Sequence, residues 1–355
     1  MNILVYTYGS SGALLFCRII EELLYEDKKI FNRLYEDSGS SYVNLFDLNF
    51  KTNEATVYMS DLKVGEFKRY DLDILLDSVP VVISVADPEK IERVLQKFAK
   101  VYFVHRDVRD VAISFLESNG LPRNEKLYKS DVFILSIINI FKKQINFIRN
   151  NRNIFKLKSF YDMKFDFSKV ISSLSKDLDI KNVDIDNFIF KFKEKDKNES
   201  YSLNRKTQKF DKYIGKFDSV SYSLFSLVDE ELNWLGYKFV KDSILLDKVR
   251  VFNKNNQLVG LLSLDNIVIY GGGYAYYYGL KDIVKPVCII DDNPIFDFGF
   301  ESLTLESFKD RYNFLNYNYI LTASKATTIA KMDENLLNLG VSPNKIFSIL
   351  PVYGN

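Results

Sequence analysis

The chain has 355 residues, of which 47% are hydrophobic and 27% charged, and its 48 basic residues nearly balance its 47 acidic ones. This composition is typical of a globular protein, with too many apolar residues for a disordered chain and too many charges for a bundle of membrane helices. The net charge of +1 gives no basic field that would attract nucleic acid, so no nucleic-acid partner is expected. At about 100–200 residues per domain, the length predicts two domains.

Cysteine and histidine are scarce: the chain has two cysteines, Cys17 and Cys288, and one histidine, His105. Two cysteines are too few for a disulfide framework, so reduced cytosolic thiols are expected. Zinc sites of the usual His-rich or Cys-rich kinds, and any Ser-His-Asp triad without His105, are nearly excluded. The apolar run 13–24 contains one Arg and two Glu, which predicts an amphipathic helix instead of a membrane span, and a cytoplasmic protein.

Short apolar runs alternate with amphipathic stretches in the first part of the chain. Three runs predict buried strands: 3–6, 80–85 and 100–104. Three stretches predict the helices that follow them: 13–25, 89–99 and the residues from 108 onward. Residues 31–70 are polar and are expected to be irregular, with a possible hairpin at 54–59. The β-α-β-α-β order predicts a parallel sheet with helices on its faces.

Further helices are predicted along the middle of the chain, at 131–149, 187–199 and 219–234, with Gly236 as a C-cap of the last one. After about residue 245 the pattern of short strands restarts. A hairpin is predicted within 249–264, and four buried strands follow: 266–270, 287–290, 319–323 and 345–349. This second region is expected to be a small α/β domain.

Two segments of the first region suggest phosphate binding. Gly9, Ser10, Ser11, Gly12 and Ala13 join the first strand to a helix, where backbone N–H groups and the helix dipole attract anions. Small residues in such a turn also have a purely steric explanation.

In the second segment, Arg106 ends the third strand and Ser114 follows eight positions later on the next helix. A strand-end arginine and a helix hydroxyl would together clamp one phosphate. The alternative is that Arg106, Asp107, Arg109 and Asp110 form a solvated, self-paired cluster at the helix start.

The segment 101–115 resembles the 3′-phosphate-binding segment of the PAPS-dependent sulfotransferases, through Arg106, Asp107, Arg109, Asp110 and Ser114. Three weaker likenesses follow the same order along residues 1–240: 7–13 resembles that family's 5′-phosphosulfate loop, 158–163 its Tyr-Glu-Asp-Leu segment, and 204–207 its late Arg-Lys-Gly loop. The resemblance implies that Gly9 to Ala13 bind the 5′-phosphosulfate of PAPS. It also implies that Arg106, Ser114, Arg205 and Lys206 hold the 3′-phosphate. Sulfuryl transfer of this kind needs no metal, so no metal is expected.

The chain departs from the family pattern where the family carries catalytic charge. Ser10 stands at the loop position of a lysine or arginine, and no histidine occurs in 85–88, where many members have a catalytic one. Losing one charge-stabilising group costs roughly 10²–10³-fold in rate. His105 and Asp87 are the candidate bases for an acceptor hydroxyl. Strand alternation points His105 away from the Arg106 face, so a packed histidine is its alternative role; for Asp87 the alternative is helix capping.

The second region contains a glycine turn, Gly271 to Gly273, between a predicted strand and a helix. Tyr276 stands where the dinucleotide-binding pattern has its third glycine, while Asp291 and Asp292 end the next strand, where an acidic group would meet a ribose. This stretch resembles the small Rossmann-like domains of bacterial sugar acetyltransferases and methyltransferases. Gly271, Gly273, Asp291 and Asp292 are therefore candidate ligand residues; a docking domain without a ligand is the alternative.

The sequence thus predicts a two-domain α/β protein, with a sulfotransferase-like P-loop fold (a three-layer parallel sheet) in 1–245 and a Rossmann-like domain in 246–355. The resemblance implies transfer of a sulfuryl group from PAPS to a hydroxyl of a sugar or nucleotide sugar in polysaccharide biosynthesis. Two alternatives stay open: a catalytically silent nucleotide-binding scaffold, and a same-fold transferase with another donor. A homo-oligomer is possible.

Overall fold

The structure is a computed structural model. It describes residues 2–9, 12–25, 42–60, 65–78, 81–119, 121, 127–198, 213–238, 246–292, 294, 296, 298–299 and 302–351. The chain forms two compact units, each made of two stretches. The first comprises residues 1–107 and 143–210, and the second 108–142 and 211–355. The predicted domain boundary at residue 245 falls inside the second unit. Each predicted domain contains one of the two sheets. The division into domains at this residue stays a prediction.

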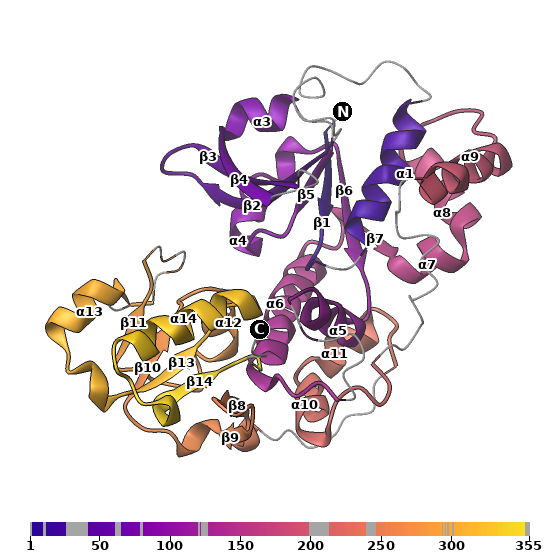
Figure 1. Cartoon of the computed structure of the whole chain (residues 1–355). Helices are drawn as coiled ribbons and strands as arrows, with labels where there is room; N and C mark the ends of the chain where they lie inside the picture. Colours follow the sequence, from indigo (N-terminus) through magenta and orange to yellow (C-terminus); the bar gives the residue numbers. More distant parts are fainter. Residues whose placement is uncertain are drawn as a thin grey trace. The chain divides into compact units, whose positions relative to one another are not determined.

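The first unit is built on a seven-stranded sheet in the order β4-β3-β2-β5-β1-β6-β7 (Figure 1). Four strands in a row, β5 (Val81–Ser84), β1 (Ile3–Tyr6), β6 (Lys100–His105) and the edge strand β7 (Phe155–Ser159), are parallel to one another. The α/β class and parallel sheet predicted from the sequence are confirmed. Because parallel strands end at one edge of the sheet, the residues that follow β5, β1 and β6 lie along that edge.

Residues 42–71 correct the prediction of an irregular segment. They form three antiparallel strands, β2 (Tyr42–Asn49), β3 (Glu54–Ser60) and β4 (Gly65–Asp71), and β2 joins β5 in parallel. The predicted hairpin strand at 54–59 is thus the middle strand of a three-stranded meander. Antiparallel strands with one solvated face carry polar residues at alternate positions, which explains why the segment looked irregular.

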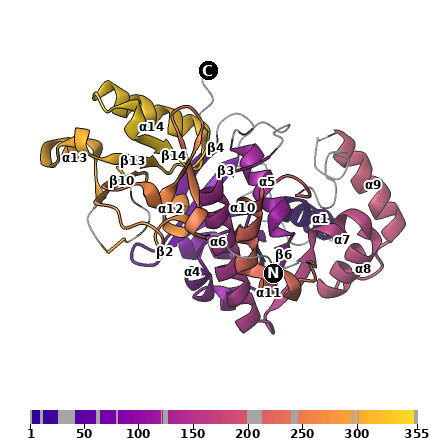
Figure 2. The same cartoon turned by 90° about the horizontal axis from the view of Figure 1, so that it is seen from below.

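Helices cover both faces of the first sheet. Alternate strand residues, including Ile3, Val5 and Val104, pack on one face in a core shared with four helices: α1 (Ala13–Tyr25), α7 (Phe160–Phe165), α8 (Phe167–Asp177) and α9 (Ile185–Asn198). Figures 1 and 2 show these helices gathered beside the sheet. On the other face, Tyr6 meets Phe147 of α6 (Asp131–Asn150) with ring centroids 6.0 Å apart. The chain passes between strands through α3 (Leu72–Ser78), α4 (Pro88–Glu92) and a 3-10 turn at Leu95–Lys97.

The second unit has its own seven-stranded sheet, in the order β12-β11-β10-β13-β14-β8-β9. The strands are β8 (Arg250–Asn253), β9 (Leu258–Gly260), β10 (Ile267–Tyr270), β11 (Cys288–Ile290), β12 (Ser302–Leu303), β13 (Asn318–Leu321) and β14 (Ile346–Ser348). The predicted hairpin and the four predicted strands are all present; β8 and β9 pair antiparallel, and β10 to β14 pair in parallel.

Helices α12 (Tyr274–Gly279), α13 (Leu305–Arg311) and α14 (Ala326–Asn338) accompany this sheet (Figure 2). The unit also contains α5 (Val108–Ser118), the first part of α6, α10 (Ser219–Ser223) and α11 (Asp229–Trp234), with 3-10 turns at Leu224–Val228, Leu246–Lys248, Leu261–Ser263, Phe314–Asn316 and Pro343–Lys345. Gly236 has φ +84°, as a C-cap requires, and its N–H donates to Asn233.

A buried charge network ties the helices of the second unit to its sheet. Arg250 on β8 donates to Asp131, which begins α6, at 2.7 Å and to Asp218, which caps α10, at 2.9 Å. Ser221 donates to the same Asp131 carboxylate at 2.6 Å. The Asp131 side chain is 0% exposed, so this charge depends on Arg250 and Ser221 for its solvation.

None of the helices in the described part of the chain is long and apolar enough to cross a membrane. Cys17 and Cys288 are both free thiols in buried positions.

Candidate functional site

The described residues of the loop after β1 include two glycines with positive φ. Gly9 and Gly12 have φ of +81° and +92°, a region that side chains disfavour, and Gly12 accepts the N–H of Phe16 at the start of α1. A Cβ on Gly12 would lie 2.2 Å from the ring of Phe160, so only glycine fits there. Ala13 begins α1, whose 13 residues give it a helix dipole. Ser10 and Ser11 lie outside the described residues.

Arg106 follows β6 and contacts two residues, Tyr8 and Phe160. Its backbone N–H donates to the Tyr8 hydroxyl at 2.6 Å, and that hydroxyl donates to the Arg106 carbonyl. Its guanidinium carbon lies 4.9 Å from the centroid of the Phe160 ring, the same ring that contacts Gly12. Arg106 is 4% exposed, so its positive charge lies inside the protein beside the loop.

A second cation borders the same ring: Lys164 Nζ on α7 lies 5.8 Å from the Phe160 centroid. Phe160 therefore stands next to two positive charges and to the glycine that precedes α1. The sequence contained Phe160 within the segment 158–163, but no pattern in it identified the ring as the contact between the loop and Arg106.

His105 lies on the face of the sheet that Tyr6 and Phe147 occupy, as strand alternation predicts. Its ring stacks on Phe103, with centroids 6.1 Å apart and planes at 19°. The residue is 6% exposed, and burial lowers the pKa of its imidazole to about 4. His105 is therefore neutral at pH 7, in the form of a base but with little access to a substrate; its catalytic role stays a prediction.

Asp87, the other predicted base, lies beyond the end of β5 and serves as the N-cap of α4, accepting the Glu89 N–H at 3.1 Å. Its other carboxylate oxygen accepts from Lys143 Nζ at 2.7 Å, and Lys143 also lies 3.2 Å from Glu89. Asp87 thus has the capping role that was its alternative. Its side chain stays 22% exposed, and catalysis by this carboxylate remains a prediction.

Ser114 belongs to the second unit, where its hydroxyl donates to the Asp110 carbonyl at 3.0 Å. Arg109 in the same helix donates to the Lys238 carbonyl at 2.9 Å and lies 3.9 Å from the centroid of the Tyr213 ring. Asp110 accepts the N–H of Tyr213 at 3.2 Å. Arg109 and Asp110 thus both contact residues 213–238, and the self-paired cluster stays an untested alternative. Arg205 and Lys206 lie outside the described residues.

The glycine turn of the second unit is bonded to an acidic side chain. Gly272 N–H donates to Asp291 Oδ2 at 2.5 Å, and a Cβ on Gly272 would meet the Phe298 ring at 2.6 Å. Gly271 has φ +103°, whereas at Gly273 no described residue other than its chain neighbours lies within 4 Å of where a Cβ would be. Tyr276, at the place of the missing third glycine, is 1% exposed. An aspartate of the chain itself thus takes an N–H that a dinucleotide phosphate would need.

Aromatic rings gather beside this turn. Tyr277 stacks on Phe296 with centroids 4.2 Å apart, and Tyr274 stacks on Tyr278 at 5.9 Å. The rings of this cluster are half-buried and pack on one another. Asp292 lies near Tyr270, whose pKa is raised by burial and by the charges of Asp292 and Asp291. The ligand role of these residues stays a prediction.

Among the residues that the structure describes, no group of three or more His, Cys, Asp or Glu side chains is placed to hold a metal ion.

No protein-family model and no curated protein matches the chain. Among solved structures, the chain is similar to a crystal structure of a mouse sulfotransferase complexed with PAP. The alignment covers 65% of this chain and 83% of the mouse chain, with a TM-score of 0.41 and 17% sequence identity.

Proposed function

We propose that the first unit binds PAPS and transfers its sulfuryl group to a hydroxyl of a sugar or glycan precursor. The observation that carries this proposal is the contact of one ring, Phe160, with both Gly12 and Arg106. It brings a buried guanidinium next to the turn that opens α1. Both features attract anions, which supports a ligand with phosphate at two ends of a nucleoside.

The proposed roles follow from this arrangement and from the sequence resemblance. The loop from Gly9 to Ala13 would bind the 5′-phosphosulfate through backbone N–H groups, and Arg106 the 3′-phosphate. Ser114, Arg205 and Lys206 are further proposed contributors to the 3′-phosphate, on the resemblance alone.

The transfer itself breaks the bond between sulfur and the bridging oxygen and forms a bond between sulfur and the acceptor oxygen. The electron pair of the broken bond stays on the 5′-phosphate of PAP, and the acceptor proton goes to a base. Asp87 is the better-exposed candidate for that base, with a side chain 22% exposed, whereas His105 is 6% exposed. As in phosphoryl transfer, positioning and stabilisation of charge carry most of the catalysis.

Titration calorimetry with PAP tests the proposal. We expect micromolar binding to the wild type, weakened roughly 10–150-fold in Arg106→Ala, since hydrogen bonds to charged groups contribute about 1.5–3 kcal/mol. Adenosine 5′-phosphosulfate, which lacks the 3′-phosphate, should bind both proteins equally.

The matched control is Arg93→Ala. Arg93 also lies over a phenylalanine ring, 3.8 Å from the Phe50 centroid, but it follows α4 and is exposed. PAP affinity should be unchanged in this variant. Absence of PAP binding to the folded wild type contradicts the proposal.

A nucleotide-binding protein without turnover is the second candidate. The burial of His105 and the engagement of Asp87 by both α4 and Lys143 favour it, because they restrict both predicted bases. It predicts PAP binding of the same strength, with no release of PAP from PAPS in a screen of sugar and nucleotide-sugar acceptors.

A further inference from the structure

The β1 loop has a serine, Ser10, at the position where the resemblance implies a basic residue. A sulfuryl donor still needs a positive charge there, because the 5′-phosphate becomes more negative as the sulfur–oxygen bond breaks. We propose that Lys143, on α6, supplies this charge and contacts the 5′-phosphosulfate. The inference rests on the proposed function and adds a catalytic residue to it.

The first observation is the contact of α6 with the start of the loop. Gln144 Nε2 donates to the Thr7 carbonyl at 3.3 Å, and both residues are buried. Thr7 itself donates its N–H to Ser84 at the end of β5, 3.0 Å away. Lys143 precedes Gln144, so its Cα atom lies about 3.8 Å from the Cα atom of the residue that contacts Thr7.

The second observation is the direction of the Lys143 side chain. Its ammonium reaches Asp87, just beyond the end of β5, at 2.7 Å. In the sheet order, β5 and β6 flank β1 on opposite sides, and Arg106 follows β6. The end of β1 therefore has Arg106, after β6, on one side and Asp87, after β5 and paired with Lys143, on the other. A nucleotide with its 3′-phosphate toward Arg106 would direct its other charged end toward Lys143.

The third observation is that Lys143 is charged and accessible. Burial alone would lower its pKa, but hydrogen bonds and charges from Asp87 and Glu89 outweigh this effect and raise the pKa above its ordinary value. The side chain is 35% exposed, so a ligand can reach it. An ammonium group has three N–H donors, two of which suffice for the two carboxylates.

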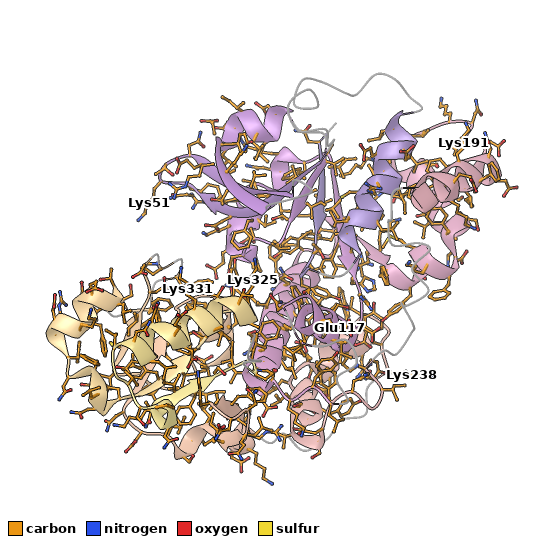
Figure 3. The ribbon with its side chains drawn as sticks, viewed as in Figure 1. Lys51, Glu117, Lys191, Lys238, Lys325 and Lys331 are labelled. Carbon is orange, nitrogen blue, oxygen red and sulfur yellow. The ribbon has the colours of Figure 1, made fainter. Side chains whose placement is uncertain are left out.

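Several other described lysines of the first unit have different positions or partners. Lys51, in the turn before β3, and Lys191, on α9, project from the outside of the unit (Figure 3). Lys158, on β7, donates to Ser173 Oγ at 2.8 Å. Lys164 lies over the Phe160 ring, which Arg106 also contacts. Lys90 bonds Asp47 of β2, a strand farther from β1, at 2.6 Å.

The test measures what the 5′-phosphate contributes to affinity, and it needs no acceptor. PAP, adenosine 3′-phosphate and adenosine 5′-phosphate are titrated into the wild type and into Lys143→Ala. The ratio of the dissociation constants of adenosine 3′-phosphate and PAP reports the 5′-phosphate. We expect Lys143→Ala to lower this ratio roughly 10-fold or more, as loss of a hydrogen bond to a charged group predicts. Affinity for adenosine 3′-phosphate should stay as it is, and Lys143→Arg should restore most of the ratio.

Two variants separate this role from a structural one. Lys90→Ala is the matched control, because Lys90 is 38% exposed and forms an ion pair of similar length; its ratio should equal that of the wild type. Asp87→Asn removes a negative charge beside Lys143 and should raise PAP affinity a few-fold. If the Asp87–Lys143 pair only braces α6 against α4, Asp87→Asn and Lys143→Ala should weaken binding alike.

Each outcome decides a different claim. PAP binding with an unchanged ratio in a folded Lys143→Ala protein overturns the role of Lys143 and leaves the proposed function intact. No PAP binding to the wild type overturns both. If Lys143→Ala does not fold, Lys143→Met keeps the apolar stem of the side chain without its charge, and the same ratio is measured on it.

Discussion

The turn after β1 and the turn after β10 share one plan, in which a buried parallel strand leads through glycines into a helix, yet their surroundings carry opposite charge. Around the first, Arg106 and Lys164 border the Phe160 ring that contacts Gly12. Around the second, the Asp291 carboxylate accepts the Gly272 N–H at 2.5 Å. The comparison teaches that a glycine turn offers N–H groups, and that the neighbouring strand ends decide whether an external anion or the chain's own carboxylate receives them.

The strongest way to break this comparison is to substitute both glycines. Gly12→Ala places a methyl group 2.2 Å from the Phe160 ring at φ +92°, so the ring must move and Arg106 with it; PAP binding should be lost. Gly272→Ala meets the Phe298 ring at 2.6 Å in the second unit and should lower stability while PAP affinity stays unchanged. Calorimetry and thermal unfolding of both variants provide the measurements.

Gly215→Ala is the control for backbone strain. Gly215 has φ +68°, but no described residue other than its chain neighbours lies within 4 Å of its Cβ position. If this variant loses PAP binding as Gly12→Ala does, the contact between Gly12 and Phe160 is not the cause.

A smaller effect distinguishes the two units by pH. The chain has one histidine, His105, in the first unit, and burial lowers its pKa to about 4 from 6.5. The unfolded chain therefore binds a proton between these values that the folded chain excludes. Stability is lost as pH falls from 6.5 to 4, by up to about 3 kcal/mol.

Urea unfolding across this pH range measures the effect. His105→Gln should flatten the His-dependent part of the slope, leaving the contribution of the carboxylates. An equal slope in wild type and variant would show that His105 titrates normally in the folded protein.

The smallest expected effect sharpens the second half of the comparison. Asp291→Asn keeps an acceptor for the Gly272 N–H but removes its charge, so the free energy of unfolding should fall by about 1 kcal/mol. That corresponds to a shift of roughly 2–4 °C in the thermal midpoint, with unchanged affinity for PAP. An increase in the free energy of unfolding would mean that the Asp291 charge destabilises the folded protein.

Much of the site's framework could be predicted because its signals are local. The strands at 3–6, 81–84 and 100–105, the glycines of the first loop and the strand-end position of Arg106 all follow from short stretches of sequence. The contacts of Lys143 with Asp87 and of Gln144 with Thr7 could not be predicted. Lys143 and Gln144 lie within a long amphipathic helix, and their partners are 56 and 137 residues away.

Phe160 was missed for a related reason. An aromatic residue after a strand predicts burial, and only the fold shows that its ring meets Gly12 and Arg106. The strands β2 to β4 were missed because their polar residues alternate with apolar ones over short runs, interrupted by a register shift between Leu45 and Asp47.

The Arg250 network has a consequence for how such a gene can be inherited. Asp131 and Asp218 precede residue 245 and Arg250 follows it, and the single positive charge of Arg250 pairs with both carboxylates in one cluster. Recombination at the junction that the sequence suggests would leave two acids without their base, or the base without its acids, at a cost of about 3–5 kcal/mol. We therefore expect that recombination which transfers the C-terminal sheet to another protein also transfers residues 108–142 and Asp218.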